Sequence, residues 1–210
     1  MKELKSNEIR REVVRIAKKA EESGLCQYKS GNFSIIDRER GLVYITPSGI
    51  SREELTSDMI AVVDIDGNIV EAPYKPSIEV SMHINTYKIK QEATGVAHSH
   101  SRYATLFACM GKEILPVTIE AVHYGGVPIK VADYAAPGSK ELAKSIVEPL
   151  KESEVCLLKY HGVLASGQTL EKALLNLIYV EEVAFLYYHL LTLGKKEFLP
   201  QEIFDSLKNA

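Results

Sequence analysis

The chain has 210 residues, of which 46% are hydrophobic and 25% charged, a mixture typical of a soluble globular protein with one sizeable core. Its 25 basic and 28 acidic residues give a formal net charge of −3 without any basic tract, so we expect no nucleic acid partner. The sequence pattern predicts neither a membrane span nor a secretory signal, and we expect no membrane partner.

The cysteines indicate a reducing compartment. Cys26, Cys109 and Cys156 are odd in number, lie far apart and form no C-x-x-C motif. Scattered cysteines of this kind are typical of buried, reduced thiols in an intracellular protein. We therefore expect the protein to be cytoplasmic.

Hydrophobic spacing and turn residues predict a mixture of helices and strands. The expected elements, in chain order, are a helix over 7–22, strands over 33–37, 42–46, 61–65 and 68–70, a helix over 79–90, a strand over 95–100, a helix over 102–110, a strand over 127–132, a helix over 137–150, strands over 155–159 and 163–165, and a long apolar helix over 169–193. A short mobile helix is expected in the tail over 200–210.

Strands and helices interleave in this pattern, yet hairpins are frequent. That combination favours a three-layer α/β/α fold with a mixed, mainly antiparallel central sheet over a purely parallel one. The sequence contains no internal repeat, low-complexity segment or linker, so we expect a single domain over residues 1–210.

The strongest chemical signal is the pair His98 and His100 on a predicted strand. Residues i and i+2 of a strand point to the same face, so the two imidazoles can converge on one ion. His161, before a glycine at the end of another predicted strand, could add a third ligand, and Glu79 at a helix start could add a carboxylate. Catalytic zinc takes about three protein ligands and keeps one open position. Taken alone, the pattern leaves both a metal site and ordinary packed histidines open.

Two glycine-containing turns and one helix start could bind an anion. Gly31-Asn32 and Ser48-Gly49 each place a flexible glycine beside hydrogen-bonding groups, and Ser77 precedes a helix whose first amides have no partner within the helix. Together these neutral donors could hold a phosphate. Each of the three segments is also typical of an ordinary turn or helix cap.

Five motifs in this order resemble the class II aldolase/adducin family over about residues 7–195. They are Ser30-Gly31-Asn32-Phe33-Ser34, Ile45-Thr46-Pro47-Ser48-Gly49, Lys75-Pro76-Ser77-Ile78-Glu79, His98-Ser99-His100 and Tyr160-His161-Gly162. The resemblance implies one zinc ion per subunit, with manganese or cobalt as other possible metals, and a homotetramer whose active sites lie between subunits. The implied metal ligands are Glu79, His98, His100 and His161, and the implied phosphate ligands are Gly31, Asn32, Ser48, Gly49 and Ser77.

The resemblance also implies a reaction. A zinc-dependent aldolase of this family would cleave a ketose 1-phosphate, such as L-fuculose 1-phosphate, into dihydroxyacetone phosphate and a small aldehyde through an enediolate, with Glu79 as the acid/base. The alternative is L-ribulose-5-phosphate 4-epimerase or a related sugar-phosphate epimerase or decarboxylase. A metal-free scaffolding domain, as in adducin, would be expected to lack the histidines.

Two positions depart from the family pattern. Ile78 stands where the family usually has a second serine, so one hydroxyl donor to phosphate is missing. Glu120 occupies the position of the tyrosine that serves the aldolases as proton donor from an adjacent subunit, and the corresponding aspartate of the epimerases falls near Tyr124. Glu120, His123 and Tyr124 are therefore the candidate second acid/base residues, and the substrate and stereochemistry stay open.

Overall fold

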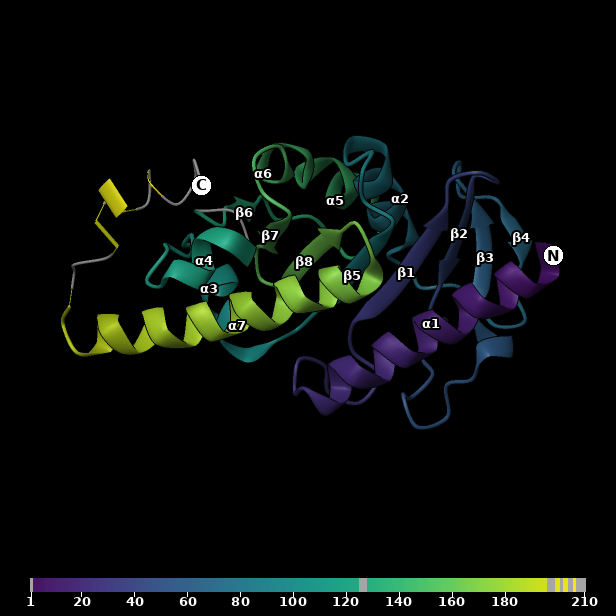
Figure 1. Ribbon diagram of the computed structural model, residues 1–210, viewed down its shortest axis with the longest axis horizontal. Helices are drawn as coiled ribbons and strands as arrows, with labels where there is room; N and C mark the ends of the chain where they lie inside the picture. Colours follow the sequence, from purple (N-terminus) through teal and green to yellow (C-terminus); the bar gives the residue numbers. More distant parts are fainter. Residues whose placement is uncertain (1, 125–127, 196–198, 201, 204–205, 207–210) are drawn as a thin grey trace.

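The computed structural model describes residues 2–124, 128–195, 199–200, 202–203 and 206, with the backbone alone for 2–4 and 122–124 (Figure 1). Within these residues an eight-stranded sheet has the strand order β4-β3-β2-β1-β5-β8-β7-β6. The strands are β1 (Asn32–Asp37), β2 (Leu42–Ile45), β3 (Ala61–Asp64), β4 (Ile69–Glu71), β5 (Gly95–Ser99), β6 (Val131–Ala132), β7 (Val155–Leu158) and β8 (Gly162–Gly167). Neighbouring strands are antiparallel except β6 and β7, which confirms the mixed, mainly antiparallel sheet.

Helices cover both faces of this sheet (Figure 1). They are α1 (Lys2–Glu22), α2 (Val80–Ile89), α3 (Arg102–Met110), α4 (Ile119–Tyr124), α5 (Lys140–Ser145), α6 (Val147–Leu150) and α7 (Leu170–Thr192), with a 3-10 turn, η1, at Ser57–Met59. The core on one face contains α1, α3 and α7, and the core on the other contains α2, α5 and α6. The predicted three-layer α/β/α architecture is therefore confirmed.

The two cores follow from strand periodicity, because successive side chains of a strand point to opposite faces. In β5, Ala97 belongs to the core with α7, whereas Val96 belongs to the core with α2. His98, two residues after Val96, therefore points to the α2 side. Gly95 starts this strand beneath α7, where the backbone of Leu170 leaves no space for a Cβ.

Several predicted elements differ from the observed ones. The helix expected over 137–150 begins only at Lys140, where Ser139 caps it by accepting a bond from the Leu142 amide (3.1 Å), and it divides at Ile146 into α5 and α6. The strand expected over 127–132 is reduced to β6, and residue 127 lies outside the described residues. Most of the tail over 200–210 also lies outside them, and α4 and η1 were not predicted.

Helix α7 is long and apolar enough to cross a membrane, with a mean hydropathy of 1.3 in its most apolar window. The sequence pattern did not predict such a segment. Its buried residues, including Leu174 and Leu177, belong to the core beside β5 and β8. α7 is therefore a core helix of the α/β/α fold.

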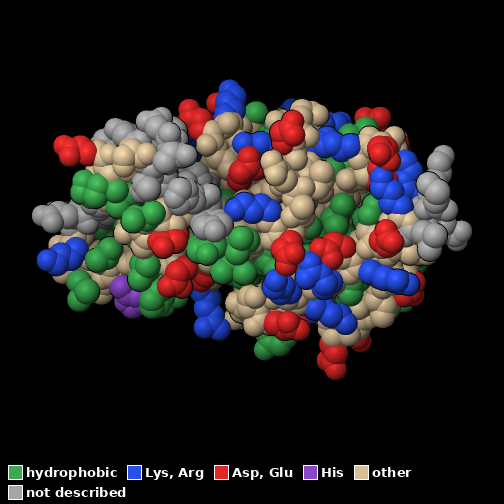
Figure 2. All heavy atoms as spheres, in the orientation of Figure 1, with side chains coloured by type: hydrophobic (Ala, Val, Ile, Leu, Met, Phe, Trp, Pro, Cys, Tyr) green, Lys and Arg blue, Asp and Glu red, His purple; other side chains and the backbone are tan. Residues whose placement is uncertain are grey.

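The surface and the thiols bear on the remaining sequence predictions. On the face drawn in Figure 2, acidic and basic side chains intermingle without a continuous basic patch. Cys26 and Cys156 are buried free thiols, as predicted, but Cys109 is exposed, so the prediction was wrong for that residue.

Candidate active site

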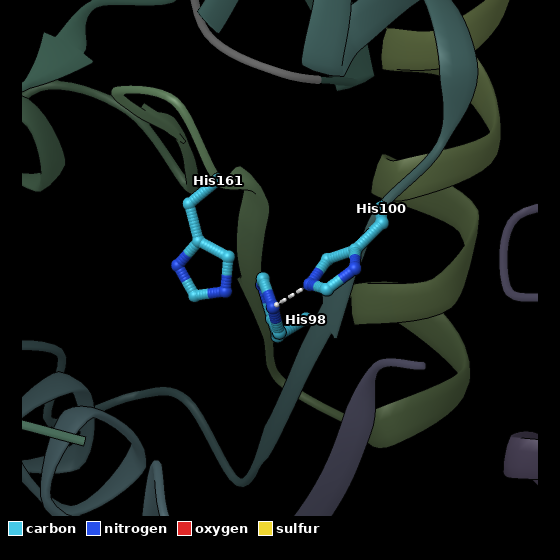
Figure 3. A group of neighbouring side chains, drawn as sticks. All are labelled: His98, His100 and His161. Atoms are coloured by element: carbon cyan, nitrogen blue, oxygen red, sulfur yellow. Dashed lines mark hydrogen bonds between the residues drawn. The ribbon is translucent and has the colours of Figure 1, made fainter. Parts of the chain in front are cut away.

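Three imidazoles converge at the C-terminal end of β5 and the start of β8, two neighbouring strands in the middle of the sheet (Figure 3). His98 belongs to β5, His100 follows that strand, and His161 lies in the turn between β7 and β8. The ring centroids are 4.9 Å apart for His98 and His100, 4.7 Å for His98 and His161, and 5.0 Å for His100 and His161. One potential ligand atom from each lies within 4.8 Å of the others. The structure thus brings together the three histidines that the sequence singled out.

Gly162 makes this approach possible. A Cβ at this position would overlap the carbonyl oxygen of Ser99 and would lie 3.0 Å from His100 Cδ2 and 3.2 Å from His98 Cε1. The residue after His161 must therefore lack a side chain if the three rings are to meet.

We expect Gly162→Ala to lower zinc affinity at least tenfold and to destabilise the fold by about 1–3 kcal/mol, because the methyl group must displace two of the rings. Competition with a chromophoric chelator measures the affinity. Gly41→Ala is the control: Gly41 has a positive φ of 64° in open space, so alanine there strains the backbone away from the histidines. If both variants bound zinc like the parent chain, the proposed role of Gly162 would be wrong.

The tautomer and charge of His98 suit a metal ligand. Its Nδ1–H donates to the Val163 carbonyl oxygen (2.9 Å), which leaves Nε2 as an unprotonated nitrogen 3.0 Å from His100 Nε2. Burial holds the pKa of His98 well below its usual value, and the neighbouring His100 and His161 lower it further. Burial also lowers the pKa of His100. His98 and His100 thus each have a nitrogen lone pair available to bind a metal near neutral pH.

Glu79 adds a carboxylate beside the three imidazoles. The residue is 5% exposed; its Oε2 lies 3.4 Å from His98 Nε2, and its Oε1 lies 3.5 Å from His161 Nε2. Oε1 is buried without a hydrogen-bond partner, which is unfavourable for a carboxylate oxygen. Three imidazoles and a carboxylate with a free oxygen form a donor set that fits a divalent cation such as zinc.

A buried chain of hydrogen bonds positions Glu79. Its Oε2 accepts from Asn32 Nδ2 (2.8 Å), and Asn32 Oδ1 accepts from His83 Nε2–H (2.6 Å). His83 Nδ1 in turn lies 2.7 Å from Ser34 Oγ, which lies 2.8 Å from Tyr87 Oη. Sequence reasoning placed Asn32 at the phosphate only. Its contact with Glu79 was missed because it depends on the pairing of β1 with β5, which sets Asn32 opposite His98.

Burial lowers the pKa of His83 to about 3, so this ring is neutral in the folded protein at neutral pH. In the unfolded chain it gains a proton below about pH 6.5, so the unfolded state binds more protons between about pH 6.5 and 3. We expect His83 to lower the free energy of unfolding by about 1.4 kcal/mol for each pH unit below about 6.5. Urea unfolding of chelator-treated protein at pH 7.5, 6.0 and 5.0 measures this slope. The His83→Gln variant should lose that part of it, and an equal slope in both proteins would contradict the assignment.

The predicted phosphate-binding segments lie side by side near these residues. Thr46 joins two of them, since its amide donates to the Phe33 carbonyl oxygen (3.0 Å) and its own carbonyl oxygen accepts from the Ser77 amide (3.2 Å). The Ser48 amide donates to the Lys75 carbonyl oxygen (2.8 Å). The segments of Gly31-Asn32, Ser48-Gly49 and Ser77 are thus neighbours.

Within this group the exposure differs. Ser48 and Gly49 are exposed, and Gly49 has a positive φ of 76° with open space around it. Ser77 is buried, and its Oγ accepts from the Glu79 amide (3.3 Å) at the start of α2. Gly31 is tightly enclosed: a Cβ there would lie 2.6 Å from both Cys26 Sγ and the His98 carbonyl oxygen. The predicted phosphate-binding segment at Gly31 is thus in contact with His98 of the histidine cluster.

The second acid/base candidates lie on α4. Glu120 is exposed, and no hydrogen bond or ion pair joins it to the three histidines among the described residues. The side chains of His123 and Tyr124 lie outside the described residues. Within one chain, therefore, the structure does not bring Glu120 to the histidine cluster.

Comparisons with known proteins agree with this geometry. Residues 11–188 match the family model described as Class II Aldolase and Adducin N-terminal domain. The chain is 32% identical over 198 residues to the 5-deoxy-D-ribulose 1-phosphate aldolase of Bacillus thuringiensis serovar kurstaki, covering 94% of this chain and 92% of that protein. It is 37% identical over 172 residues to the L-ribulose-5-phosphate 4-epimerase of Salmonella paratyphi B, covering 77% and 75%. A solved structure of an L-fuculose 1-phosphate aldolase superposes with a TM-score of 0.92 at 33% identity, covering 96% of this chain and 95% of that one.

Proposed function

Because the chain belongs to the class II aldolase and adducin family, we propose that it is a zinc-dependent aldolase, a carbon-carbon lyase. Its substrate would be a ketose 1-phosphate, such as L-fuculose 1-phosphate, and its products dihydroxyacetone phosphate and a small aldehyde. The observation that supports this most is the convergence of three histidines beside the unpartnered oxygen of Glu79. Residues 1–210 would act as one domain in the cytoplasm.

Glu79, His98, His100 and His161 would hold the ion. Imidazole and carboxylate ligands suit zinc, and manganese and cobalt are compatible with the same donors. When bound, the metal supplies a Lewis acid that stabilises the negative charge developing on the substrate oxygens as the carbon–carbon bond breaks.

Glu79 would move the proton between the substrate carbon and solvent. Its Oε2 is held by Asn32 while Oε1 has no hydrogen-bond partner, so one oxygen is fixed and the other can accept a proton. The hydrogen bond from His83 Nε2–H to Asn32 Oδ1 fixes the orientation of the Asn32 amide, which must present its NH₂ group to Glu79.

Gly31, Asn32, Ser48, Gly49 and Ser77 would bind the substrate phosphate through neutral donors. Anchoring the far end of the substrate converts binding energy into orientation of the reacting carbons. Ile78 is 53% exposed and offers no side-chain donor, so we expect this site to lack a hydrogen bond worth about 0.5–1.5 kcal/mol.

The second acid/base group would come from a neighbouring subunit of a homotetramer. Glu120 is exposed on α4 and is free to approach another chain's site, where it or Tyr124 would protonate the oxygen of the departing aldehyde.

The test is a substrate panel with the zinc-loaded protein. We expect L-fuculose 1-phosphate or 5-deoxy-D-ribulose 1-phosphate to yield dihydroxyacetone phosphate and a free aldehyde. Coupled reduction of each product measures the two separately. Absence of a free aldehyde with every ketose 1-phosphate would contradict the aldolase proposal.

The second candidate is a 4-epimerase of L-ribulose 5-phosphate. The 37% identity with the Salmonella paratyphi B epimerase favours it. The second acid/base position does not separate the two candidates, because the chain has neither the aldolase tyrosine at Glu120 nor the epimerase aspartate near Tyr124. An epimerase keeps the carbon count, so it converts L-ribulose 5-phosphate to its 4-epimer and releases no aldehyde.

A further inference from the structure

Arg52 is a buried cation in the segment that follows Ser48-Gly49. It is 2% exposed, and its Nη2 donates to the carbonyl oxygens of Ser30 (2.9 Å) and Gly31 (2.6 Å). Its guanidinium carbon lies 5.5 Å from the centre of the Phe33 ring. In the sequence Ser51-Arg52-Glu53-Glu54 this residue reads as part of an exposed charged turn, so its burial needs a reason.

No carboxylate lies within ion-pair distance of Arg52 among the described residues, and its Nε has no hydrogen-bond partner. The Glu21 carboxylate attracts the guanidinium from beyond that distance, and the Cys26 thiol is a further side-chain hydrogen-bond partner. Burial lowers the pKa of this guanidinium, but arginine keeps its proton in proteins. A buried cation without a carboxylate in direct contact is unfavourable. Two carbonyl dipoles, the Cys26 thiol, one aromatic face and the more distant Glu21 offset part of that penalty and leave the positive charge in place.

Arg52 also connects two of the predicted phosphate-binding segments, Ser48-Gly49 and Gly31-Asn32. Its backbone comes three residues after Gly49, and its side chain holds the loop that presents Gly31 and Asn32. Two other cations lie close in sequence to the predicted phosphate-binding segments, Lys29 before Gly31 and Lys75 before Ser77. Both are exposed, so water and salt screen their charges far more than that of the buried Arg52.

We propose that Arg52 is a positioning residue of the phosphate site, which orients the Gly31-Asn32 loop and supplies a buried positive charge whose counter-ion is the bound phosphate. This inference rests on the proposed function, because that function assigns Gly31, Asn32, Ser48, Gly49 and Ser77 to the substrate phosphate. It adds a residue that makes the site selective for a phosphorylated substrate over its unphosphorylated analogue.

The experiment uses inorganic phosphate as the probe. Calorimetric titration of the zinc-loaded protein gives its dissociation constant, and steady-state kinetics give its inhibition constant against the ketose phosphate. We expect Arg52→Met to weaken phosphate binding at least tenfold, as a lost unit charge at short range predicts. Arg52→Lys keeps the charge and should recover most of that affinity. In the substituted proteins KM for the ketose phosphate should rise in parallel, while kcat changes less than threefold.

Arg38→Met is the matched control, because the Arg38 guanidinium also donates to three backbone carbonyl oxygens, those of Tyr87, Lys90 and Ala93. It should leave phosphate affinity unchanged. Unchanged phosphate affinity in folded Arg52→Met and Arg52→Lys would overturn the inference while leaving the aldolase proposal intact. Tenfold weaker phosphate binding by Arg52→Met in a protein that cleaves no sugar phosphate would overturn the proposed reaction and support the anion site. If Arg52→Met does not fold, Arg52→Gln decides, because it keeps an N–H donor for the Ser30 and Gly31 carbonyl oxygens without the charge, and parent-level phosphate affinity in it would overturn the inference.

Discussion

The Glu79→Gln variant is expected to retain its fold and, because His98, His100 and His161 remain as ligands, its zinc, but to lose about a hundredfold to ten-thousandfold in kcat. Glutamine keeps an oxygen that can accept from Asn32, so the buried chain through His83 can persist. What it lacks is the ability to take up and return a proton. The loss therefore falls on the step that moves hydrogen between substrate carbon and water.

Exchange of deuterium from solvent into dihydroxyacetone phosphate, followed by nuclear magnetic resonance, isolates that step from aldehyde binding. Exchange should fall with kcat in Glu79→Gln and persist in the control Glu53→Gln, an exposed glutamate outside the site. Deuterium exchange at the parent rate in Glu79→Gln would show that another group moves the proton.

Replacing His98 by alanine is expected to remove zinc and activity together. His98 is fully buried, and its tautomer is fixed by the bond to Val163, so it is the most strongly positioned of the three histidines. Zinc that binds only the folded state also stabilises the fold, by about 4 kcal/mol when the free zinc concentration is a thousand times the dissociation constant. A variant that cannot bind zinc loses this stabilisation.

Metal content by mass spectrometry and melting temperature with and without zinc measure both effects. The parent chain should contain one zinc and melt at a higher temperature when zinc is present, and His98→Ala should do neither. His189→Ala, at an exposed histidine of α7, should behave like the parent chain. A His98→Ala protein with full zinc content and full turnover would exclude His98 as a ligand.

Local patterns predicted most of the fold. The short apolar runs of β1 and β2, the turn at Gly49 and the apolar spacing in α7 act over a few residues, so their elements were expected within a few positions of where they lie. Helix α4 was not expected, because six residues carry too little periodicity to separate a helix from a loop. The division of α5 from α6 likewise depends on packing against the sheet.

The candidate site divides in the same way. His98-x-His100 is a two-residue pattern, and His161 and Glu79 were candidates from their places at a strand end and a helix start, which the family resemblance then made metal ligands. The link from Asn32 to both Glu79 and His83 depends on strand pairing between β1 and β5, and burial of Arg52 depends on how the loop before β1 folds. Contacts of this kind join residues 21 to 51 positions apart, and no local pattern in the sequence records them.

Crystals of the zinc-loaded protein test the central claim most directly. An anomalous difference map collected at the zinc absorption edge should contain one strong peak, about 2.0–2.1 Å from a ring nitrogen of each of His98, His100 and His161. A map without a peak among these rings, in crystals whose zinc content is one per chain, would contradict it.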